Sequence, residues 1–499
     1  MTNIMGTIGN DTLLGQGGND KIDGLSGNDL LRGGTGNDTL IGGEGNNILV
    51  GDTGSDYLDV NSSTGNNLLD GGDDNDTLSA LGDYDVVSGN NTLNGGAGND
   101  SLSANSSAGD NLLDGGNGND SLSVSGGYYD PEVSGNNTLN GGAGNDTLSA
   151  LYSTGDNFLD GGDDNDYLNV NLANGNNTLN GGVGDDSLSA NISRGNNLLS
   201  GGDGNDSLSA SNFEGYRFDN TSGTNTLNGG AGDDYLNVNC SRGANLLNGG
   251  NGNDSLSAST YGYGYGGRCY ITTGNNTLNG GAGADNLNVD YSSGDNLLSG
   301  DDGNDTLTAS GYEYDEQGEF GKGVYRRALG NNTLNGGAGA DNLIVDYSTG
   351  TNLLDGGDGN DTLSAYGALG NNTLYGGFDN DILTGGNGND IFYGGDGIDT
   401  FAFNSFNEGV DSLYDFNATD ELIQVSVAGF GGGLATPSLS PSQFTIGVSA
   451  TTIAQRFIYD LVTGGLFFDQ DGSASAFTQV KFAQLSTGLS LTENNFVVV

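Results

Sequence analysis

Glycine returns at fixed positions through most of this chain, with a period of nine residues. From Gly6 the sequence divides into GTIGNDTLL, GQGGNDKID, GLSGNDLLR and GGTGNDTLI, which share the pattern G-G-x-G-x-D-x-L-x. A unit this short cannot bury its own apolar side chain, so neighbouring units must stack and enclose a continuous core. The period therefore predicts a solenoid, whereas a chain of 499 residues would otherwise suggest about three globular domains.

Each position of the nonapeptide has a physical role. The glycines allow turns that a Cβ atom would forbid, the sixth-position Asp points along the stack, and the eighth-position Leu faces inwards from a short strand. Two nonapeptides make one coil of turn, strand, turn and strand. We therefore predict an all-β fold, a right-handed parallel β-roll of two sheets and about 18 coils, over residues 1–403. The more apolar residues 404–499 are predicted to form a β cap on its end.

The coil lengthens after Gly51 from 18 residues to 20 or more, as in residues 95–114. We interpret the longer coil as two nonapeptides and one extra pair of residues that extends a strand. Ala104 should then face inwards beside Leu102, because side chains two residues apart lie on one face of a strand.

The sixth-position residues separate into two columns, one on each edge of the predicted roll. One edge keeps aspartate, and the other begins and ends with aspartate but carries asparagine between. The predicted metal ligands on the first edge are Asp20, Asp38, Asp56, Asp76, Asp100, Asp120, Asp146, Asp166, Asp186, Asp206, Asp234, Asp254, Asp285, Asp305, Asp341, Asp361, Asp381 and Asp399. Those on the second edge are Asp11, Asp29 and Asp390.

The exchange of Asp for Asn has an electrostatic meaning. Carboxylates one coil apart, about 4.8 Å, repel by about 0.9 kcal/mol even in water, so a cation must lie between them. Carboxylate and carbonyl oxygens are the ligands of Ca²⁺. The alternative is that these aspartates only form Asx turns. We predict a largely metal-free amide ladder formed by Asn47, Asn67, Asn91, Asn111, Asn137, Asn157, Asn177, Asn197, Asn225, Asn245, Asn276, Asn296, Asn332, Asn352 and Asn372.

Composition removes several classes of function. Histidine is absent, which excludes the His-dependent nucleophilic and zinc sites, and we expect no enzymatic activity. The net charge of −54 argues against a nucleic-acid partner. No segment has the roughly 18 consecutive apolar residues of a membrane span.

The nonapeptides resemble those of the repeats-in-toxin, or hemolysin-type, calcium-binding proteins. The string DTFAFNSFNEGVDSLYDFNATDELIQVSV resembles the region after the β-roll in serralysin-like proteases and cyanobacterial relatives, and the ending ENNFVVV resembles tails of type I secretion substrates. The resemblance implies an acidic calcium-binding protein that leaves through a type I ABC exporter, is extracellular or attached to the cell surface, and folds on calcium outside the cell.

Insertions interrupt the period before the Asn-type turns. They contain Tyr128, Tyr129, Tyr216, Tyr261, Tyr263, Tyr265, Tyr270, Tyr312, Tyr314 and Tyr325, together with Arg217, Arg268, Lys322, Arg326 and Arg327. These loops either pack on one another or bind a polysaccharide or cell-surface partner, which makes an adhesin the alternative function. Ice binding by the outer Ser, Thr and Asn rows is a third reading. For Cys240 and Cys269 we expect free thiols, with a disulfide as the alternative.

Overall fold

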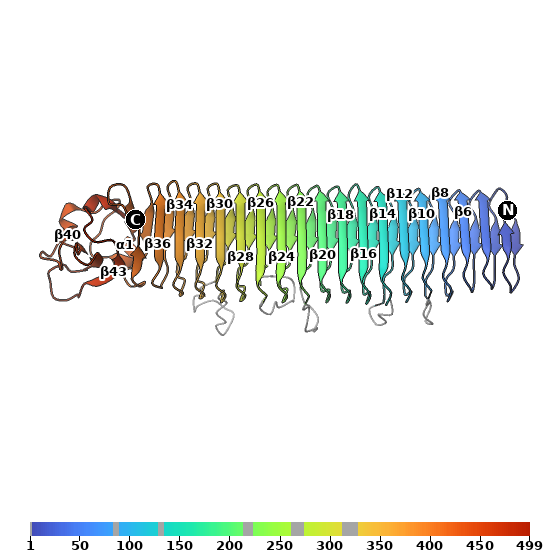
Figure 1. Ribbon diagram of the computed structural model, residues 1–499, viewed down its shortest axis with the longest axis horizontal. Helices are drawn as coiled ribbons and strands as arrows, with labels where there is room; N and C mark the ends of the chain where they lie inside the picture. The colour runs from blue at the N-terminus through green and yellow to red at the C-terminus, as the bar shows by residue number, and fades with distance from the viewer. Residues whose placement is uncertain (1, 83–88, 128–133, 213–222, 261–273, 312–327) are drawn as a thin grey trace. The chain divides into compact units, whose positions relative to one another are not determined.

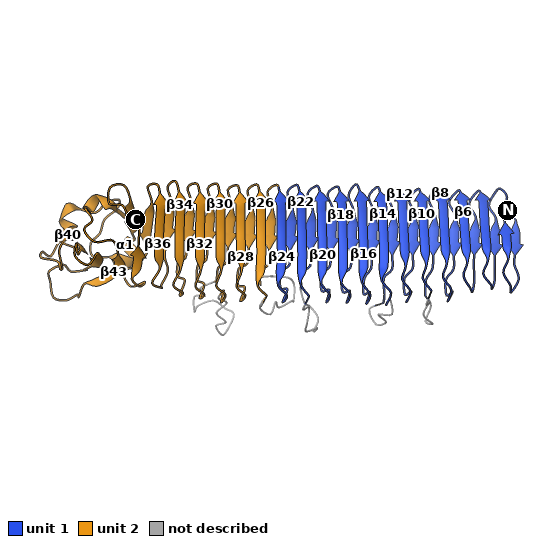
Figure 2. Ribbon diagram, viewed as in Figure 1, with its two compact units in different colours: residues 1–251, 262–269 blue, residues 252–261, 270–499 orange. Residues whose placement is uncertain are grey.

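The computed structural model describes residues 2–82, 89–127, 134–212, 223–260, 274–311 and 328–499 (Figure 1). Over these residues the chain is a parallel β-solenoid of about 19 turns with two sheets and almost no helix, which confirms the predicted β-roll. It divides into two compact units, residues 1–251 with 262–269 and residues 252–261 with 270–499 (Figure 2).

In unit 1 every coil contributes a three-residue strand to one sheet, here called sheet A. Consecutive strands of sheet A pair in parallel. They are β1 (Asn3–Met5), β3 (Lys21–Asp23), β5 (Thr39–Ile41), β7 (Tyr57–Asp59), β9 (Thr77–Ser79), β11 (Ser101–Ser103), β13 (Ser121–Ser123), β15 (Thr147–Ser149), β17 (Tyr167–Asn169), β19 (Ser187–Ser189), β21 (Ser207–Ser209) and β23 (Tyr235–Asn237).

The second strand of each coil belongs to sheet B, whose strands in unit 1 are longer after the first coil because they continue into the first turn positions, which are usually a pair of glycines. They also pair in parallel with the coil before and after. In unit 1 they are β2 (Thr12–Leu14), β4 (Leu30–Thr35), β6 (Ile48–Thr53), β8 (Leu68–Asp73), β10 (Thr92–Ala97), β12 (Leu112–Asn117), β14 (Asn137–Ala143), β16 (Asn157–Asp163), β18 (Asn177–Val183), β20 (Asn197–Asp203), β22 (Asn225–Ala231) and β24 (Asn245–Asn251).

Unit 2 repeats this arrangement. Its sheet A strands are β25 (Ser255–Ser257), β27 (Asn286–Asn288), β29 (Thr306–Thr308), β31 (Asn342–Ile344), β33 (Thr362–Ser364), β35 (Ile382–Thr384), β37 (Thr400–Phe403), β39 (Leu422–Val425) and β44 (Phe496–Val498). Its sheet B strands are β26 (Asn276–Ala282), β28 (Leu297–Asp302), β30 (Thr333–Ala338), β32 (Leu353–Asp358), β34 (Thr373–Phe378), β36 (Ile391–Asp396), β38 (Asp411–Leu413) and β43 (Val480–Gln484).

The core is a ladder of leucines held in register by the parallel pairing. Leu102, for example, pairs with Leu78 of one neighbouring coil and with Leu122 of the other, and all three are buried. Each buried leucine stabilises the fold by roughly 2 kcal/mol relative to an exposed one. Ala104 is also buried, as predicted for the extended coil.

Close stacking of the coils explains why the turns require glycine. Gly96 has a φ of +108°, and a Cβ atom there would lie 2.2 Å from the carbonyl oxygen of Gly72 in the preceding coil. Both the positive φ and this contact exclude larger residues. The glycines therefore set the distance at which the sixth-position side chains of neighbouring coils meet.

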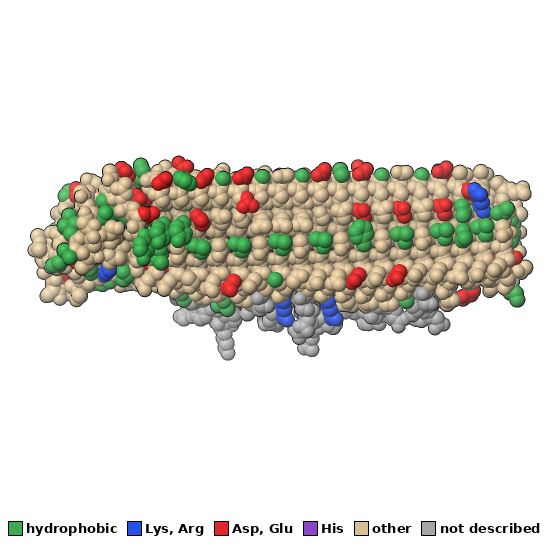
Figure 3. All heavy atoms as spheres, viewed as in Figure 1, with side chains coloured by type: hydrophobic (Ala, Val, Ile, Leu, Met, Phe, Trp, Pro, Cys, Tyr) green, Lys and Arg blue, Asp and Glu red, His purple; other side chains and the backbone are tan. Residues whose placement is uncertain are grey.

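A stripe of hydrophobic side chains follows the outer face of sheet B in both units (Figure 3). Exposed Leu68, Leu112 and Phe158 alternate there with Thr92 and Thr138 from the coils between them. Such single apolar side chains among polar neighbours are normal on a protein surface. Among the described residues, no helix has the length and apolar character needed to cross a bilayer.

Residues 404–499 continue both sheets of unit 2 before the chain becomes irregular. Strand β38 pairs with β36 and β43, while β39 pairs with β37 and with the final strand β44. The sheet is completed by β42 (Gly465–Phe468), β41 (Phe457–Tyr459) and β40 (Phe444–Ile446), with the short helices α1 (Val427–Phe430), η1 (Pro441–Gln443) and η2 (Glu493–Asn495). Buried Phe430, Phe457, Phe468 and Phe482 form its core.

The expectation of free thiols is wrong for Cys240, which is disulfide-bonded and buried. The prediction failed because the sequence gives only the spacing of the two cysteines, whereas a bridge depends on the distance between their backbones. Cys269 lies outside the described residues.

Candidate cation-binding edge

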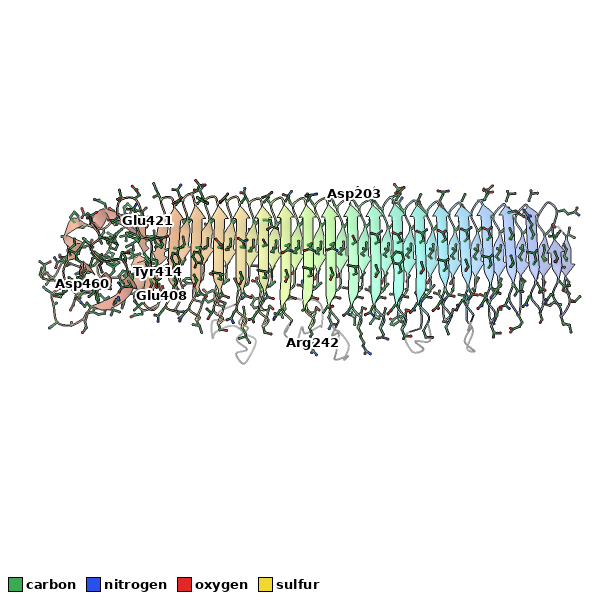
Figure 4. All side chains as sticks on the ribbon, in the orientation of Figure 1. Asp203, Arg242, Glu408, Tyr414, Glu421 and Asp460 are labelled. Carbon is green, nitrogen blue, oxygen red and sulfur yellow. The ribbon has the colours of Figure 1, made fainter. Side chains whose placement is uncertain are left out.

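The predicted aspartates of the first edge form one column in each unit, here called the Asp edge. They lie where the chain passes from a sheet B strand to the next sheet A strand, the upper edge in Figure 4, on which Asp203 is labelled. All are buried, with 4% or less of each residue exposed. The backbone fixes them, since each Asp carbonyl accepts the N–H that begins the next sheet A strand, as between Asp146 and Tyr167.

One carboxylate oxygen of each aspartate has a fixed partner. Oδ1 of Asp166 accepts the backbone N–H of Asp146 at 2.7 Å, and Oδ1 of Asp186 accepts that of Asp166 at 2.8 Å. The same bond recurs from coil to coil. Each side chain therefore reaches back to the preceding coil, and the carboxylates stack in a column.

The other carboxylate oxygen is different. Oδ2 is buried without a hydrogen-bond partner in residues that recur throughout both units of the described chain. They are Asp38, Asp56, Asp76, Asp100, Asp120, Asp146, Asp166, Asp186, Asp206, Asp285, Asp305, Asp341, Asp361, Asp381 and Asp399. A buried acceptor with no donor costs about 1–3 kcal/mol, and more when it is charged. A repeated cost of this kind is relieved by a bound cation or by protonation of the carboxylate.

The surroundings of Oδ2 fit a calcium ion. A Cβ atom placed on Gly141 would lie 2.3 Å from Oδ2 of Asp146 and 2.5 Å from the carbonyl oxygen of Gly161 in the next coil. The two oxygens thus converge beside a glycine, where no side chain of that residue intervenes. Among the described residues no three His, Cys, Asp or Glu side chains form a metal-holding group, so backbone carbonyls must complete the coordination. Carboxylate and carbonyl oxygens together suit Ca²⁺.

The raised pKa values of the aspartates on the Asp edge also favour a cation-binding site. Burial raises the pKa of Asp76 to about 7, an effect opposed by the N–H from Asp56 and reinforced by the charges of Asp56 and Asp100. Burial likewise raises the pKa of Asp166 to about 7, with added repulsion from Asp146 and Asp186. The column resists carrying its full negative charge unless cations are present.

The opposite edge, here called the Asn edge, carries the predicted amide ladder, and the hydrogen bonds confirm it. Nδ2 of Asn157 donates to Oδ1 of Asn177 at 2.8 Å and to the Gly155 carbonyl at 3.1 Å. Asn177 repeats both bonds with Asn197 and Gly175. The amide nitrogen thus stands where the Asp edge has an oxygen without a donor, and its own N–H groups make the contacts that a cation would otherwise make.

A second feature distinguishes the Asn edge from the Asp edge. The second turn position holds a buried serine in many coils: Ser153 donates to Oδ1 of Asn157 at 3.1 Å, and Ser193 donates to Oδ1 of Asn197 at 3.1 Å. On the Asp edge that position is glycine in most coils, the exceptions being Gln16, Asp52 and Asp301. The serine side chains therefore fill space that is left open beside the aspartates.

The other predicted ligands lie at the two ends of the Asn edge. Asp11 and Asp29 begin it in unit 1, where Oδ2 of Asp29 is buried without a hydrogen bond and Oδ2 of Asp11 accepts the Thr7 N–H at 2.6 Å. Asp390 lies at its end in unit 2 and is buried. The Tyr, Arg and Lys residues of the insertions lie outside the described residues.

Three acidic residues were missed from sequence. Asp411 follows Asp390 on the Asn edge, Glu421 follows Asp399 on the Asp edge, and Glu408 lies three residues before Asp411. Burial raises the pKa of Glu421 to about 8, against the N–H from Asn417 and helped by the charge of Asp399. The string Gly409-Val-Asp411-Ser-Leu413 keeps the G-x-D-x-L part of the repeat, which is the signal that would have found Asp411.

The fold and the two edges define a parallel β-solenoid with cation-binding turns. The family model of the RTX calcium-binding nonapeptide repeat matches most of the chain, at residues 3–31, 23–58, 59–87, 87–122, 105–128, 133–151, 153–174, 173–192, 193–213, 219–239, 241–259, 270–290, 291–311, 329–346, 347–368 and 366–401. The chain belongs to this family, and its repeats are calcium-binding repeats. No curated protein matches it significantly.

Proposed function

We propose that this protein is a secreted, non-catalytic structural protein whose β-roll folds when the Asp edge binds Ca²⁺ outside the cell. The observation that supports the proposal is the column of buried Oδ2 atoms without donors beside the carbonyls of the next coil. The Asp-edge residues, with Asp11, Asp29 and Asp390, are the proposed ligands. In a calcium-poor cytosol the like charges keep the chain unfolded, and millimolar calcium condenses it.

Export through a type I ABC exporter is part of this proposal. The C-terminal tail that resembles the export signal forms strand β44 in the folded protein, where Phe496 and Val498 are buried and Asn495 donates to the Glu421 carbonyl at 3.1 Å. An exporter that reads this tail must therefore engage the chain before it folds. Calcium-dependent folding after transit keeps the tail accessible inside the cell.

The test is circular dichroism of the full chain during a calcium titration from excess chelator. We expect an unfolded spectrum in chelator and a cooperative gain of β-structure as calcium rises, because binding supplies folding free energy. Magnesium at the same concentration should be less effective, since it demands smaller and more regular oxygen cages. A fully folded roll in excess chelator would contradict the proposal.

A further inference from the structure

Three tyrosines, here called the tyrosine ladder, form a stack on the outer face of sheet B in unit 2. Tyr375 lies on β34, Tyr393 lies on β36 and Tyr414 directly follows β38, and these strands pair in parallel. The rings of Tyr375 and Tyr393 are inclined by only 8°, with their centroids 4.8 Å apart. The rings of Tyr393 and Tyr414 are inclined by 11°, with their centroids 5.2 Å apart.

The tyrosine ladder lies in the last coils of the roll, beside the cap. In the coil before it, the same position holds Asp355, which pairs in register with Tyr375. On its other side, β38 pairs with β43 of the cap, and Figure 4 labels Tyr414 where the roll meets the cap. Tyr375 and Tyr414 are 38% and 56% exposed, and Tyr393 between them is half-buried. A reagent in the solvent therefore has access to the ladder.

Parallel pairing brings equivalent atoms of neighbouring rings together. The centroid separation of Tyr375 and Tyr393 equals the spacing of neighbouring strands, about 4.8 Å, so one ring is displaced from the next mainly along the stack. The carbon ortho to one hydroxyl therefore faces the same carbon of the next ring. Stacking by itself stabilises the coils, because offset aromatic pairs attract one another. Facing ortho carbons are in addition the arrangement in which two tyrosyl radicals combine.

We propose that the tyrosine ladder is a site of oxidative crosslinking, at which dityrosine bonds join Tyr393 to Tyr375 and to Tyr414. The oxidant is a haem peroxidase that uses hydrogen peroxide. It removes one electron and one proton from each of two phenols, and the two radicals form a carbon–carbon bond between positions ortho to their hydroxyls. The hydrogens on those two carbons then move to the oxygens, which restores both phenols. Each bond converts one peroxide molecule into two water molecules.

The bonds would connect the last coils of the roll to one another. The bond between Tyr375 and Tyr393 joins β34 to β36, and the bond between Tyr393 and Tyr414 joins β36 to the end of β38, the strand that pairs with the cap. A crosslink restricts the unfolded chain and so favours the folded one. The coupling requires only the folded ladder, whereas its consequence rests on the proposed calcium-dependent folding. Crosslinked coils would stay closed when calcium is removed.

A second tyrosine pair in unit 2 provides an internal control. Tyr347 and Tyr366 belong to successive coils, their ring centroids are 5.4 Å apart, and Tyr366 is 42% exposed. These rings meet edge to face, at 85°, so their ortho carbons do not face each other. Ring separation and exposure are similar to those of the ladder, and ring orientation is what differs. We expect no crosslink between these two residues.

The test treats the folded full chain, in calcium, with a haem peroxidase and hydrogen peroxide, and isolates the monomer. Cleavage before aspartate then places Tyr393 on residues 390–395 and Tyr414 on residues 411–414. Tandem mass spectrometry should find these two peptides joined, with the loss of two hydrogens. Circular dichroism before oxidation verifies that each protein compared is folded.

The variant Tyr393→Phe keeps a stacked ring but removes the central phenol. Tyr375 and Tyr414 then lie two coils apart and lose the advantage of proximity, so the yield of crosslinks to residues 411–414 should fall at least about tenfold. The matched variant Tyr366→Phe should leave that yield unchanged.

An equal yield of crosslinks between Tyr347 and Tyr366 would overturn the proposal, because ring orientation would then be irrelevant. It would also be overturned by ladder tyrosines that stay unmodified while other tyrosines are oxidised, or by crosslinks of Tyr414 that persist in Tyr393→Phe. Ladder crosslinks that form in calcium and not in excess chelator would support both the site and the proposed folding. Equal crosslinking in excess chelator would support the site and refute calcium-dependent folding.

Discussion

The Asp edge and the Asn edge both bury a polar side chain between neighbouring coils, but they differ in how its polar atoms are satisfied. On both, a buried sixth-position side chain uses one oxygen to accept an N–H from the neighbouring coil, as Asp166 and Asn67 do. They differ in the second atom of the side chain. Asn157 offers an amide nitrogen that donates twice, whereas Asp166 offers an oxygen with no donor.

Because of this difference, the protein itself satisfies the polar groups of the Asn edge, whereas those of the Asp edge are left for an ion to satisfy under the proposed function. The amide ladder is complete within the protein and has no net charge. In the carboxylate column one oxygen of most aspartates has no hydrogen-bond donor within the protein. Under the proposed function, calcium from the solution neutralises it. A roll with two amide edges would carry its own hydrogen-bond donors on both edges. Under the proposed function, the carboxylate edge makes folding conditional on calcium.

Placing acid on the Asn edge should have the largest effect. The variant Asn137→Asp/Asn157→Asp/Asn177→Asp removes the Nδ2 donors and sets carboxylates against the carbonyls of Gly135, Gly155 and Gly175. We expect it to lose about 6 kcal/mol of unfolding free energy at saturating calcium, at about 2 kcal/mol per site. Urea denaturation followed by circular dichroism measures this loss.

The matched control adds three charges at the exposed fifth turn position of three coils of the same edge, one residue before the buried column. Asn136→Asp/Asn176→Asp/Asn196→Asp alters exposed positions, where Asp110 and Asp156 already occur in other coils. This variant should unfold within about 1 kcal/mol of wild type. If calcium restored the buried variant to wild-type stability, the Asn edge would be shown to accept ions after all, and the comparison of the two edges would fail.

The reverse substitution at one site should have a smaller effect on stability. The sign of that effect should depend on the calcium concentration. Asp166→Asn supplies an amide donor but removes a proposed ligand. At saturating calcium we expect a loss of about 2–3 kcal/mol, the contribution of one ion at roughly 100 times its dissociation constant. At the lowest calcium concentrations the variant should be the more folded protein, because the introduced amide carries no charge to be neutralised.

Paired calcium titrations with thermal unfolding test this crossover. Asp163→Asn is the control, since Asp163 is an exposed turn residue at a position where Asn117 and Ala143 occur in other coils. Its titration should coincide with that of wild type. If the titration curve of Asp166→Asn ran parallel to that of wild type without crossing it, Asp166 would stabilise the turn itself and would not bind an ion.

Much of this architecture could be predicted from the sequence because the same residue types recur at the same positions in many repeats. The inward Leu, the two edges and the amide ladder each follow from residue type at a fixed phase, and Ala104 followed from strand alternation. Which carboxylate oxygen lacks a donor could not be predicted, because it depends on how far one coil is offset from the next. Asp411 and Glu421 were missed because their turns lack the first two glycines, while parallel pairing with β36 and β37 still extends the coils.

In the absence of metal, pH should change the stability contributed by the Asp edge and leave that of the Asn amides unchanged, because amides do not titrate. In the folded chain the pKa of Asp186 is raised to about 7, mainly by burial, whereas its ordinary value is 3.8. Protonation of such a group therefore favours the folded state. Its stabilising effect is complete below about pH 4 and is lost as the pH rises through about 7.

In excess chelator we accordingly expect more β-structure at about pH 5.5 than at pH 8, measured by circular dichroism. The variant Asp146→Asn/Asp166→Asn/Asp186→Asn should show a shallower dependence on pH, because three of the titrating groups are gone. Greater metal-free folding at pH 8 than at pH 5.5 would contradict the assignment of burial and repulsion to the column.

The smallest effect should come from a ladder that both edges share. At the exposed fifth turn position, Oδ1 of Asn165 on the Asp edge accepts the Asp185 N–H at 2.8 Å, and Oδ1 of Asn176 on the Asn edge accepts the Asn196 N–H at 2.9 Å. Asn165→Ala and Asn176→Ala each remove one such bond where water can replace it. We expect each to cost about 0.5–1 kcal/mol, equally on the two edges and without changing the calcium midpoint. Thermal unfolding at saturating calcium measures the cost, and a calcium dependence confined to Asn165→Ala would show that the ion site extends from the buried column to the surface of the turn.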